Sequence, residues 1–155
     1  WLNLPKEKKM VDPSYKDIQA DDIPFVNFNG GQVKVISGSY KSIIGPGRPY
    51  TGVLYLDVHI NKSSNIEIPI EDDWNAFVYV YEGEIKANLG VPKGMLAVLE
   101  TDGVFKCNAV ANNTRFLIIA GQPIREKVAR GGPFVMNTKK EILQAYDDYQ
   151  SGKLG

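Results

Sequence analysis

The sequence predicts a mainly β protein, a small antiparallel barrel or sandwich with one helix at its C-terminal end. Three observations predict this class. Short segments rich in β-branched and aromatic residues alternate apolar and polar positions. Turn residues separate these segments at intervals of about ten residues over most of the region from Thr51 to Gly121. Only the last part of the chain, after Asn137, changes from the strand period to the helix period.

Length and composition limit the kinds of protein that the chain can be. Its 155 residues suit one domain that buries about two-thirds of its unfolded surface. Lysine plus arginine equals aspartate plus glutamate at 18 each, so no net charge attracts nucleic acid or anionic lipid, and we expect neither as a direct partner. The single cysteine excludes an internal disulfide, and no secretory signal or long apolar run is present. We expect a soluble, intracellular protein.

The first residues predict a strand followed by a connector. Residues Trp1–Leu4 alternate like a short strand, which Pro5 ends because proline cannot donate to a ladder. The stretch Pro5–Pro24 is charged and interrupted by proline, so we interpret 1–24 as an N-terminal strand and interdomain connector and 25–155 as the domain. Because the chain opens on tryptophan, we expect it to be cut from a longer protein.

The clearest β unit is Trp74–Gly90, which we predict to be a hairpin around which the other strands are arranged. Residues Phe77–Tyr81 are β-branched and aromatic, and alternation resumes at Ile85 after the turn Glu82–Glu84. The first arm is apolar on both faces, so we expect it to lie centrally in the sheet and to be covered on both sides.

The remaining strands follow from the same alternation. In Thr51–Ile60, leucine, valine and isoleucine occupy one face and should point into the core, while Tyr55, Asp57 and His59 occupy the other. Turns are predicted at Asn27–Gly31 and Thr101–Gly103. Further strands are predicted at Val33–Ser37, Ile66–Ile70, Met95–Leu99, Val104–Val110 and Arg115–Ala120.

A helix is predicted over Lys139–Gln150. Thr138 and Glu141 form a capping box at its start, and Gly152 ends it. Ile142, Tyr146 and Tyr149 share one face, by which the helix should dock on the barrel.

Few residues suggest chemistry. Asp57 and His59 point the same way on one strand, as in a carboxylate–imidazole base, but a polar outer face is the favoured interpretation. Glu67 and Glu71 could join Asp57 and His59 around a divalent metal ion, but the spacing of these four residues matches no metal-ligand pattern. Cys107 alternates with apolar residues and is predicted to be buried and inert. We therefore assign no catalytic, cofactor-binding or metal-binding residue to this chain.

Two other segments are interpreted as structural. The loop Gly45–Pro49 resembles a phosphate-binding turn only in its glycines and arginine, and its prolines remove donors, so an ordinary surface turn is favoured. Lys6, Lys8 and Lys9 are interrupted by Glu7, which favours a solvated connector over a DNA contact.

Several motifs stand out along the chain. The longest is Gly131–Thr138, GGPFVMNT, which follows Ile119–Glu126, IAGQPIRE. Others are the opening residues Trp1–Pro5 and the shorter Lys9-Met10, Pro13–Tyr15 and Ile23-Pro24. Together these motifs resemble the pirin family, in its C-terminal half and in the segment that joins its two cupin domains, and the likeness spans the chain.

The resemblance implies a cupin-type β-barrel, a double-stranded β-helix or jelly roll, with a C-terminal helix. Pirins are bicupins whose N-terminal cupin holds iron through three histidines and a glutamate, whereas the second cupin is metal-free. This chain resembles the second, so no cofactor is expected in it and iron only in the preceding half. It has one histidine, and Pro69 and Glu71 stand about where the iron-binding half has its first two histidines.

The resemblance also implies a function. The chain is expected to be a structural and interaction module of a redox-sensitive transcriptional co-regulator, in the nucleus or cytoplasm. The alternative is part of a quercetin 2,3-dioxygenase-type enzyme whose iron lies in the other half. Expected partners are the N-terminal cupin of the same protein, transcription-factor complexes and a second copy of the chain.

Two groups of residues are singled out for these roles. Trp1, Leu2 and Leu4 are large apolar residues at a terminus, where a domain normally keeps polar sequence, and are predicted to form the interface with the other cupin or a partner. The motif residues are given a structural role, in which they shape the lead into the C-terminal helix. They are Gly131, Gly132, Pro133, Phe134, Asn137 and Thr138.

Overall fold

A computed structural model describes residues 1–100 and 103–154. Two compact units share the chain. One, the barrel unit, is Lys16–Pro123, and the other, the small unit, combines Trp1–Tyr15 with Ile124–Gly155. The predicted boundary after residue 24 concerns domains and stays a prediction.

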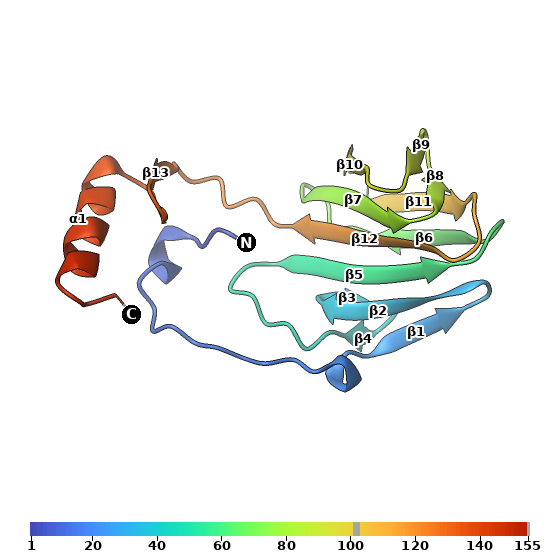
Figure 1. Ribbon diagram of the computed structural model, residues 1–155, viewed down its shortest axis with the longest axis horizontal. Coiled ribbons are helices and arrows are strands. Elements are labelled where there is room, and N and C mark those ends of the chain that lie inside the picture. The colour runs from blue at the N-terminus through green and yellow to red at the C-terminus, as the bar shows by residue number, and fades with distance from the viewer. Residues whose placement is uncertain (101–102, 155) are drawn as a thin grey trace. The chain divides into compact units, whose positions relative to one another are not determined.

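The barrel unit is built of antiparallel strands after one short 3-10 helix, η2 (Ala20–Asp22). One sheet has six strands in the order β1-β2-β5-β12-β7-β10, and the other has four in the order β6-β11-β8-β9. Figure 1 shows the long strands β5, β12 and β7 side by side. The strands are β1 (Phe25–Phe28), β2 (Gly31–Ser37), β3 (Ser39–Tyr40), β4 (Ile43–Ile44), β5 (Val53–Ile60), β6 (Asn65–Pro69), β7 (Asn75–Glu82), β8 (Glu84–Lys86), β9 (Gly90–Pro92), β10 (Leu96–Leu99), β11 (Val104–Ala109) and β12 (Thr114–Gly121).

The core lies between the two sheets and is supplied by the alternate residues of their strands. On β5 the residues Leu54, Leu56, Val58 and Ile60 are buried, while the opposite face is half-buried, as alternation predicts. Phe116 on β12 is fully buried and contacts Phe105 edge to face, with ring centroids 6.3 Å apart. Each such side chain contributes about 1.5–3 kcal/mol by leaving water. The predicted mainly β fold with a C-terminal helix is confirmed.

The predicted hairpin Trp74–Gly90 is wrong in its pairing, although both of its strands exist. Strand β7 pairs with β12 and β10 in the six-stranded sheet, whereas β8 pairs with β11 and β9 in the other. At Gly83, between them, φ is +74°, and a Cβ there would lie 2.4 Å from Thr114 Oγ1. The chain therefore turns from one sheet into the other at a position that only glycine suits.

The prediction that β7 is central and covered on both sides is also wrong. It is next to the edge strand β10. Its inner residues Ala76, Val78 and Val80 are buried, whereas Tyr79 on the outer face is 38 % exposed. Aromatic residues suit a half-exposed sheet face because they pack on side chains of the neighbouring strands. The aromatic outer face of β7 therefore did not have to be buried.

Smaller differences concern turns. The predicted turn Asn27–Gly31 is shorter, because β1 runs through Phe28 and pairs with β2. The predicted turn Thr101–Gly103 includes residues 101 and 102, which lie outside the described residues.

The small unit contains the C-terminal helix α1 (Lys139–Gln150), with the bounds predicted from the sequence. Both halves of the capping box are present, with Glu141 N donating to Thr138 Oγ1 at 3.2 Å and Thr138 N donating to Glu141 Oε2 at 2.8 Å. Ile142 and Ala145 are buried. The helix packs on a hairpin of β13 (Ala129–Gly131) and β14 (Phe134–Met136), and Tyr146 meets Phe134 edge to face at 5.1 Å. The unit also holds the short 3-10 helix η1 (Lys6–Lys8).

The predicted strand Trp1–Leu4 is wrong. These residues form no strand in the structure, and η1 follows directly after Pro5. Apolar alternation alone did not make a strand here, because a strand also needs a neighbour that accepts its backbone hydrogen bonds.

Candidate interaction surface

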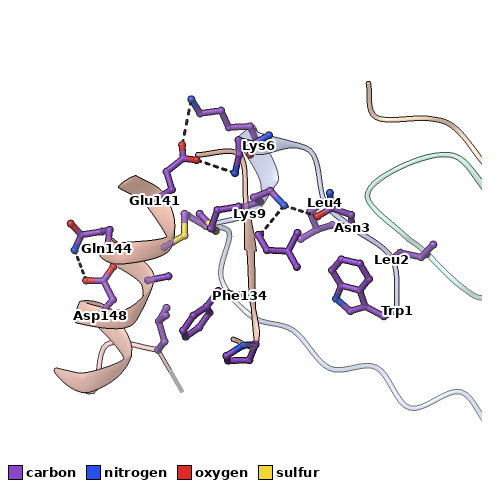
Figure 2. Close-up of a pocket in the computed structure, with 17 residues that line it drawn as sticks. Trp1, Leu2, Asn3, Leu4, Lys6, Lys9, Phe134, Glu141, Gln144 and Asp148 are labelled. Atoms are coloured by element: carbon purple, nitrogen blue, oxygen red, sulfur yellow. Dashed lines mark hydrogen bonds and ion pairs between the residues drawn. The ribbon is translucent and has the colours of Figure 1, made fainter. Parts of the chain in front are cut away.

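The small unit carries an apolar groove with a volume of about 480 Å³. One wall is the N-terminal segment from Trp1 to Met10, and the other is β14 with one face of α1. Phe134, Met136 and Ala145 supply apolar lining, and Figure 2 shows Phe134 beside α1. The N-terminal segment therefore covers only part of the apolar surface that β14 and α1 form.

Polar contacts hold the N-terminal segment in place. Most of them join it to residues near the other end of the chain. Lys9 Nζ donates to Asn3 Oδ1 at 2.6 Å and to the carbonyl of Val135 at 3.1 Å (Figure 2). The backbone N–H of Lys6 donates to Glu126 Oε2 at 2.9 Å, and Lys6 Nζ lies 3.5 Å from Glu141 Oε1. The segment is therefore an integral part of the small unit. It is tied down by the lysines that we interpreted as a solvated connector.

The three predicted interface residues differ in exposure. The side chain of Trp1 is 89 % exposed, that of Leu2 is 51 % exposed, and Leu4 is half-buried. All three line the groove, with Leu4 packed into the unit and Trp1 open to solvent. Their role as an interface stays a prediction.

The motif Gly131–Thr138 builds the hairpin turn and the helix cap. Gly132 has φ of +54°, and a Cβ at Gly131 would lie 2.5 Å from Ile142 Cγ2, so both glycines allow the hairpin to reach α1. Asn137 Nδ2 donates to Glu126 Oε2 at 2.8 Å and to the carbonyl of Lys127 at 2.9 Å, while its Oδ1 is buried without a partner. Sequence analysis missed Glu126, although it ends the motif that precedes the hairpin.

Asp57 and His59, which we interpreted as part of a polar outer face, do not contact one another as a carboxylate and an imidazole base would. The Asp57 carboxylate accepts a hydrogen bond from the Tyr81 hydroxyl at 2.7 Å, and His59 Nε2 is buried without a hydrogen-bond partner. Both residues lie on the outer face of the six-stranded sheet, away from the core. No base aligned by a carboxylate is assembled there.

The described residues do not fit a metal centre. Residues 1–100 and 103–154 contain no group of three histidine, cysteine, aspartate or glutamate side chains that brings ligands together. Glu67 forms an ion pair with Lys106 at 3.0 Å, and Pro69 and Glu71 are exposed. We therefore derive no metal-dependent step for this chain.

Two further candidates are also structural. Cys107 is buried, and burial raises the pKa of its thiol to about 12. Arg48 donates from Nη1 to the carbonyls of Gly45 and Gly47 in its own loop, so the guanidinium that an anion would need is already engaged.

Among the described helices, none is long and apolar enough to cross a bilayer.

Two facing antiparallel sheets followed by a C-terminal helix define a cupin-type domain. Residues 55–155 match the family described as the Pirin C-terminal cupin domain. The chain belongs to the pirin family and corresponds to its C-terminal cupin half, which confirms the resemblance found in the sequence motifs.

Relatives from plants and animals agree with this assignment. A pirin-like protein from Solanum lycopersicum is 38 % identical, and the match covers 100 % of this chain and 55 % of the relative. Pirin from Homo sapiens is 36 % identical, with coverage of 100 % and 56 %. The chain thus spans about half the length of the curated relatives that it matches.

A solved structure has a similar fold. The crystal structure of quercetin 2,3-dioxygenase from Acinetobacter baumannii matches with a TM-score of 0.91 at 32 % identity, over 100 % of this chain and 55 % of that one.

Proposed function

We propose that this chain is a structural and interaction module, and that its main partner is the iron-binding N-terminal cupin of the same protein. One observation carries the proposal. Trp1 and Leu2 stay exposed at the rim of an apolar groove, in a chain that spans about half of its relatives. The contact runs through Trp1, Leu2 and Leu4.

The energetics support a covered surface. Burying a large apolar side chain gains about 1.5–3 kcal/mol, so a partner that covers the exposed side chains of Trp1 and Leu2 would gain free energy from them. The contacts of Lys6 and Lys9 hold the N-terminal segment in one conformation. A segment that is already ordered loses less conformational entropy when it binds a partner.

The wider role follows from the family resemblance. We propose that the whole protein acts as a redox-sensitive co-regulator of transcription-factor complexes, in the nucleus or cytoplasm, with iron held in its N-terminal half. The likeness to a quercetin 2,3-dioxygenase supports the alternative, an enzyme of that type. In either case this chain supplies a surface rather than the reacting centre.

The binding proposal is tested with two separate proteins, this chain and the N-terminal cupin of a pirin relative. Mixed together, they should form a 1:1 complex by size-exclusion chromatography with light scattering. A double variant, Trp1→Ser with Leu2→Ser, should weaken the complex by about tenfold or more, because it removes the apolar contact. Tyr15→Ser is the matched control, since Tyr15 is 92 % exposed and lies outside the groove.

The outcomes separate the possible occupants. A complex that forms equally well with the double variant would contradict the interface. If the chain alone is dimeric and the same variant makes it monomeric, the occupant is a second copy and not the N-terminal cupin.

The enzyme alternative is tested by flavonol consumption under oxygen with added Fe(II). We expect no turnover by this chain alone, and turnover only after the N-terminal cupin is added. Saturable turnover by the chain alone, lost in His59→Ala or Glu71→Ala, would reveal a site that the geometry does not suggest.

A further inference from the structure

The strand β10 ends the six-stranded sheet on the side opposite to β1, as Figure 1 shows. Among the described strands only β7 pairs with it, so its other side is a free edge. The side chains of Leu96 and Val98, on the outer face of the sheet, are 51 % and 79 % exposed. Tyr79, which stands opposite Leu96 on β7, is 38 % exposed and extends this apolar surface. The free edge therefore coincides with exposed apolar side chains.

The other end strands of the two larger sheets are better protected than β10. Proteins usually protect such edges with charged side chains or proline, which oppose pairing with another chain. In the four-stranded sheet, β6 carries Glu67 and Pro69, and β9 carries Pro92. At the far end of the six-stranded sheet, β1 has Asn27 at an exposed position. The sequence of β10 is Leu-Ala-Val-Leu, without charge or proline, so nothing in this strand opposes the addition of a further strand.

The backbone groups of β10 that face the free edge follow from its pairing with β7. The N–H of Val80 donates to the carbonyl of Met95 at 3.1 Å, so Met95 is hydrogen-bonded toward β7. In an antiparallel pair, such positions alternate with positions whose N–H and C=O point away from the partner strand. Ala97 therefore also bonds toward β7, whereas the N–H and C=O groups of Leu96 and Val98 point to the free edge. The two residues with exposed side chains thus also present their backbone groups there.

We propose that two copies of this chain pair in antiparallel orientation through their β10 strands and so join their six-stranded sheets. A two-fold axis through Ala97 places Leu96 of each copy opposite Val98 of the other. These residues have their backbone groups on the free edge, so each pair exchanges both of its hydrogen bonds. On the outer face each pair brings leucine against valine, and at the axis the two Ala97 methyl groups meet on the inner face. No like charges oppose one another in this register.

The fit of this edge to itself identifies a second copy as the occupant. A contact across a two-fold axis needs a self-complementary surface, and β10 supplies one in its side chains and in its backbone groups. Because the strand is short, the contact is small, and we expect an association that depends on concentration and not a permanent dimer. The inference goes beyond the proposed function, which uses Trp1, Leu2 and Leu4 of the small unit.

The first experiment measures self-association of the 155-residue chain by analytical ultracentrifugation. The average mass should rise with protein concentration between about 10 μM and about 1 mM, where small interfaces associate. Val98→Lys puts a charge into each apolar pair and should lower the association constant by about tenfold or more. Val128→Lys is the matched control and should not change it, because Val128 is 53 % exposed and lies in the small unit, outside β10. Circular dichroism establishes that both variants are folded.

Each result of this experiment decides for or against the pairing. A chain that stays monomeric over the whole concentration range overturns the proposal. Self-association that Val98→Lys leaves unchanged overturns it too. The same holds for self-association that is abolished by Trp1→Ser with Leu2→Ser, since the second copy would then lie at the groove. If Val98→Lys weakens only the complex with the N-terminal cupin of a pirin relative, that cupin occupies the edge and the proposal is wrong.

The second experiment tests the register with oxidised glutathione as the oxidant. Ala97→Cys places two thiols across the axis at a non-hydrogen-bonded pair, where the two Cβ atoms lie close enough for a disulfide, so a covalent dimer should form. Leu96→Cys is the matched control. Its position is more exposed, but the two copies of residue 96 stand two residues apart along the paired strands, too far for a disulfide. Both variants keep the buried Cys107.

The expected result is a covalent dimer of Ala97→Cys that forms at least about tenfold faster than that of Leu96→Cys, because only the former pair meets the distance limits of a disulfide. No covalent dimer of Ala97→Cys, or one that forms no faster than the control, would overturn the register and with it the proposal.

Discussion

The Tyr81 hydroxyl donates a hydrogen bond of 2.7 Å to Asp57 Oδ1 and so links β7 to β5 across the strand β12 that lies between them. The pKa of Tyr81 is raised to about 12, first by burial and then by the hydrogen bond and negative charge of Asp57, with Arg115 acting in the opposite direction. The neutral phenol is therefore the form that the folded sheet favours.

This raised pKa predicts a loss of stability at high pH. Below the ordinary pKa of 10.0 both folded and unfolded states keep the Tyr81 proton, so its contribution is fully present. Between that value and about 12 the unfolded state releases the proton first, and stability falls as the pH rises. Urea unfolding across this pH range should show a smaller loss in Tyr81→Phe. Tyr15→Phe, at a 92 % exposed position, is the control and should behave like the parent chain.

Cys107 should resist thiol reagents while the protein is folded. Its thiolate is the reactive form, and burial raises the thiol pKa to about 12. We expect labelling at neutral pH only at the rate of unfolding, and immediate labelling in denaturant. Rapid stoichiometric labelling of folded protein would mean that the thiol is accessible.

Gly132→Ala should destabilise the small unit more than Gly152→Ala does. Both positions have positive φ, at +54° and +72°, so both substitutions carry a conformational cost of about 1–2 kcal/mol. A Cβ at Gly132 would also lie 2.3 Å from Tyr146 Oη, whereas nothing lies within 4 Å of one at Gly152. Thermal unfolding monitored on the helix signal measures the difference. Equal shifts would show that Tyr146 moves aside without cost.

Thr138→Ala should weaken the start of α1. Its hydroxyl accepts from the Glu141 backbone N–H at 3.2 Å, and loss of such a cap costs about 1 kcal/mol. Thr138→Ser keeps the acceptor and should retain most of the stability in the same denaturant titration. A Ser variant as unstable as the Ala variant would assign the effect to the lost methyl group.

The isolated chain should hold no iron after dialysis. Its one histidine lies on the outer face of a sheet, and the described residues bring no three metal ligands together. Elemental analysis of protein purified with iron present measures this, and near-stoichiometric iron would contradict it.

The sequence predicted local structure better than it predicted neighbours. The bounds of α1 and the inward face of β5 follow from periodicity and capping, which are set by residues close together in the chain. Alternation says which face of a strand is apolar, but it says nothing of which strand lies beside it. The predicted pairing of β7 with β8 was therefore wrong, although both strands were found.

The candidate surface was predictable only in part. Apolar residues at a terminus indicated Trp1, Leu2 and Leu4, and the structure brings them to one groove. The contacts that hold them join residues from opposite ends of the chain, as Lys9 joins the carbonyl of Val135. Such contacts depend on the tertiary arrangement, and no spacing in one sequence indicates them.

The change of sheet at Gly83 has a consequence for how the chain folds. Strands that follow one another directly, β7 and β8, do not pair, so this unit gives no fast local hairpin as a nucleus. The central pairing of β5 with β12 instead joins Ile60 to Thr114 and Val53 to Gly121. The loop between β5 and β12 must close before the contacts of this pairing can form, and closing a long loop costs conformational entropy. We therefore expect slow refolding, as is typical of topologies with high contact order. Substitutions at the β5–β12 pairing should affect the refolding rate most.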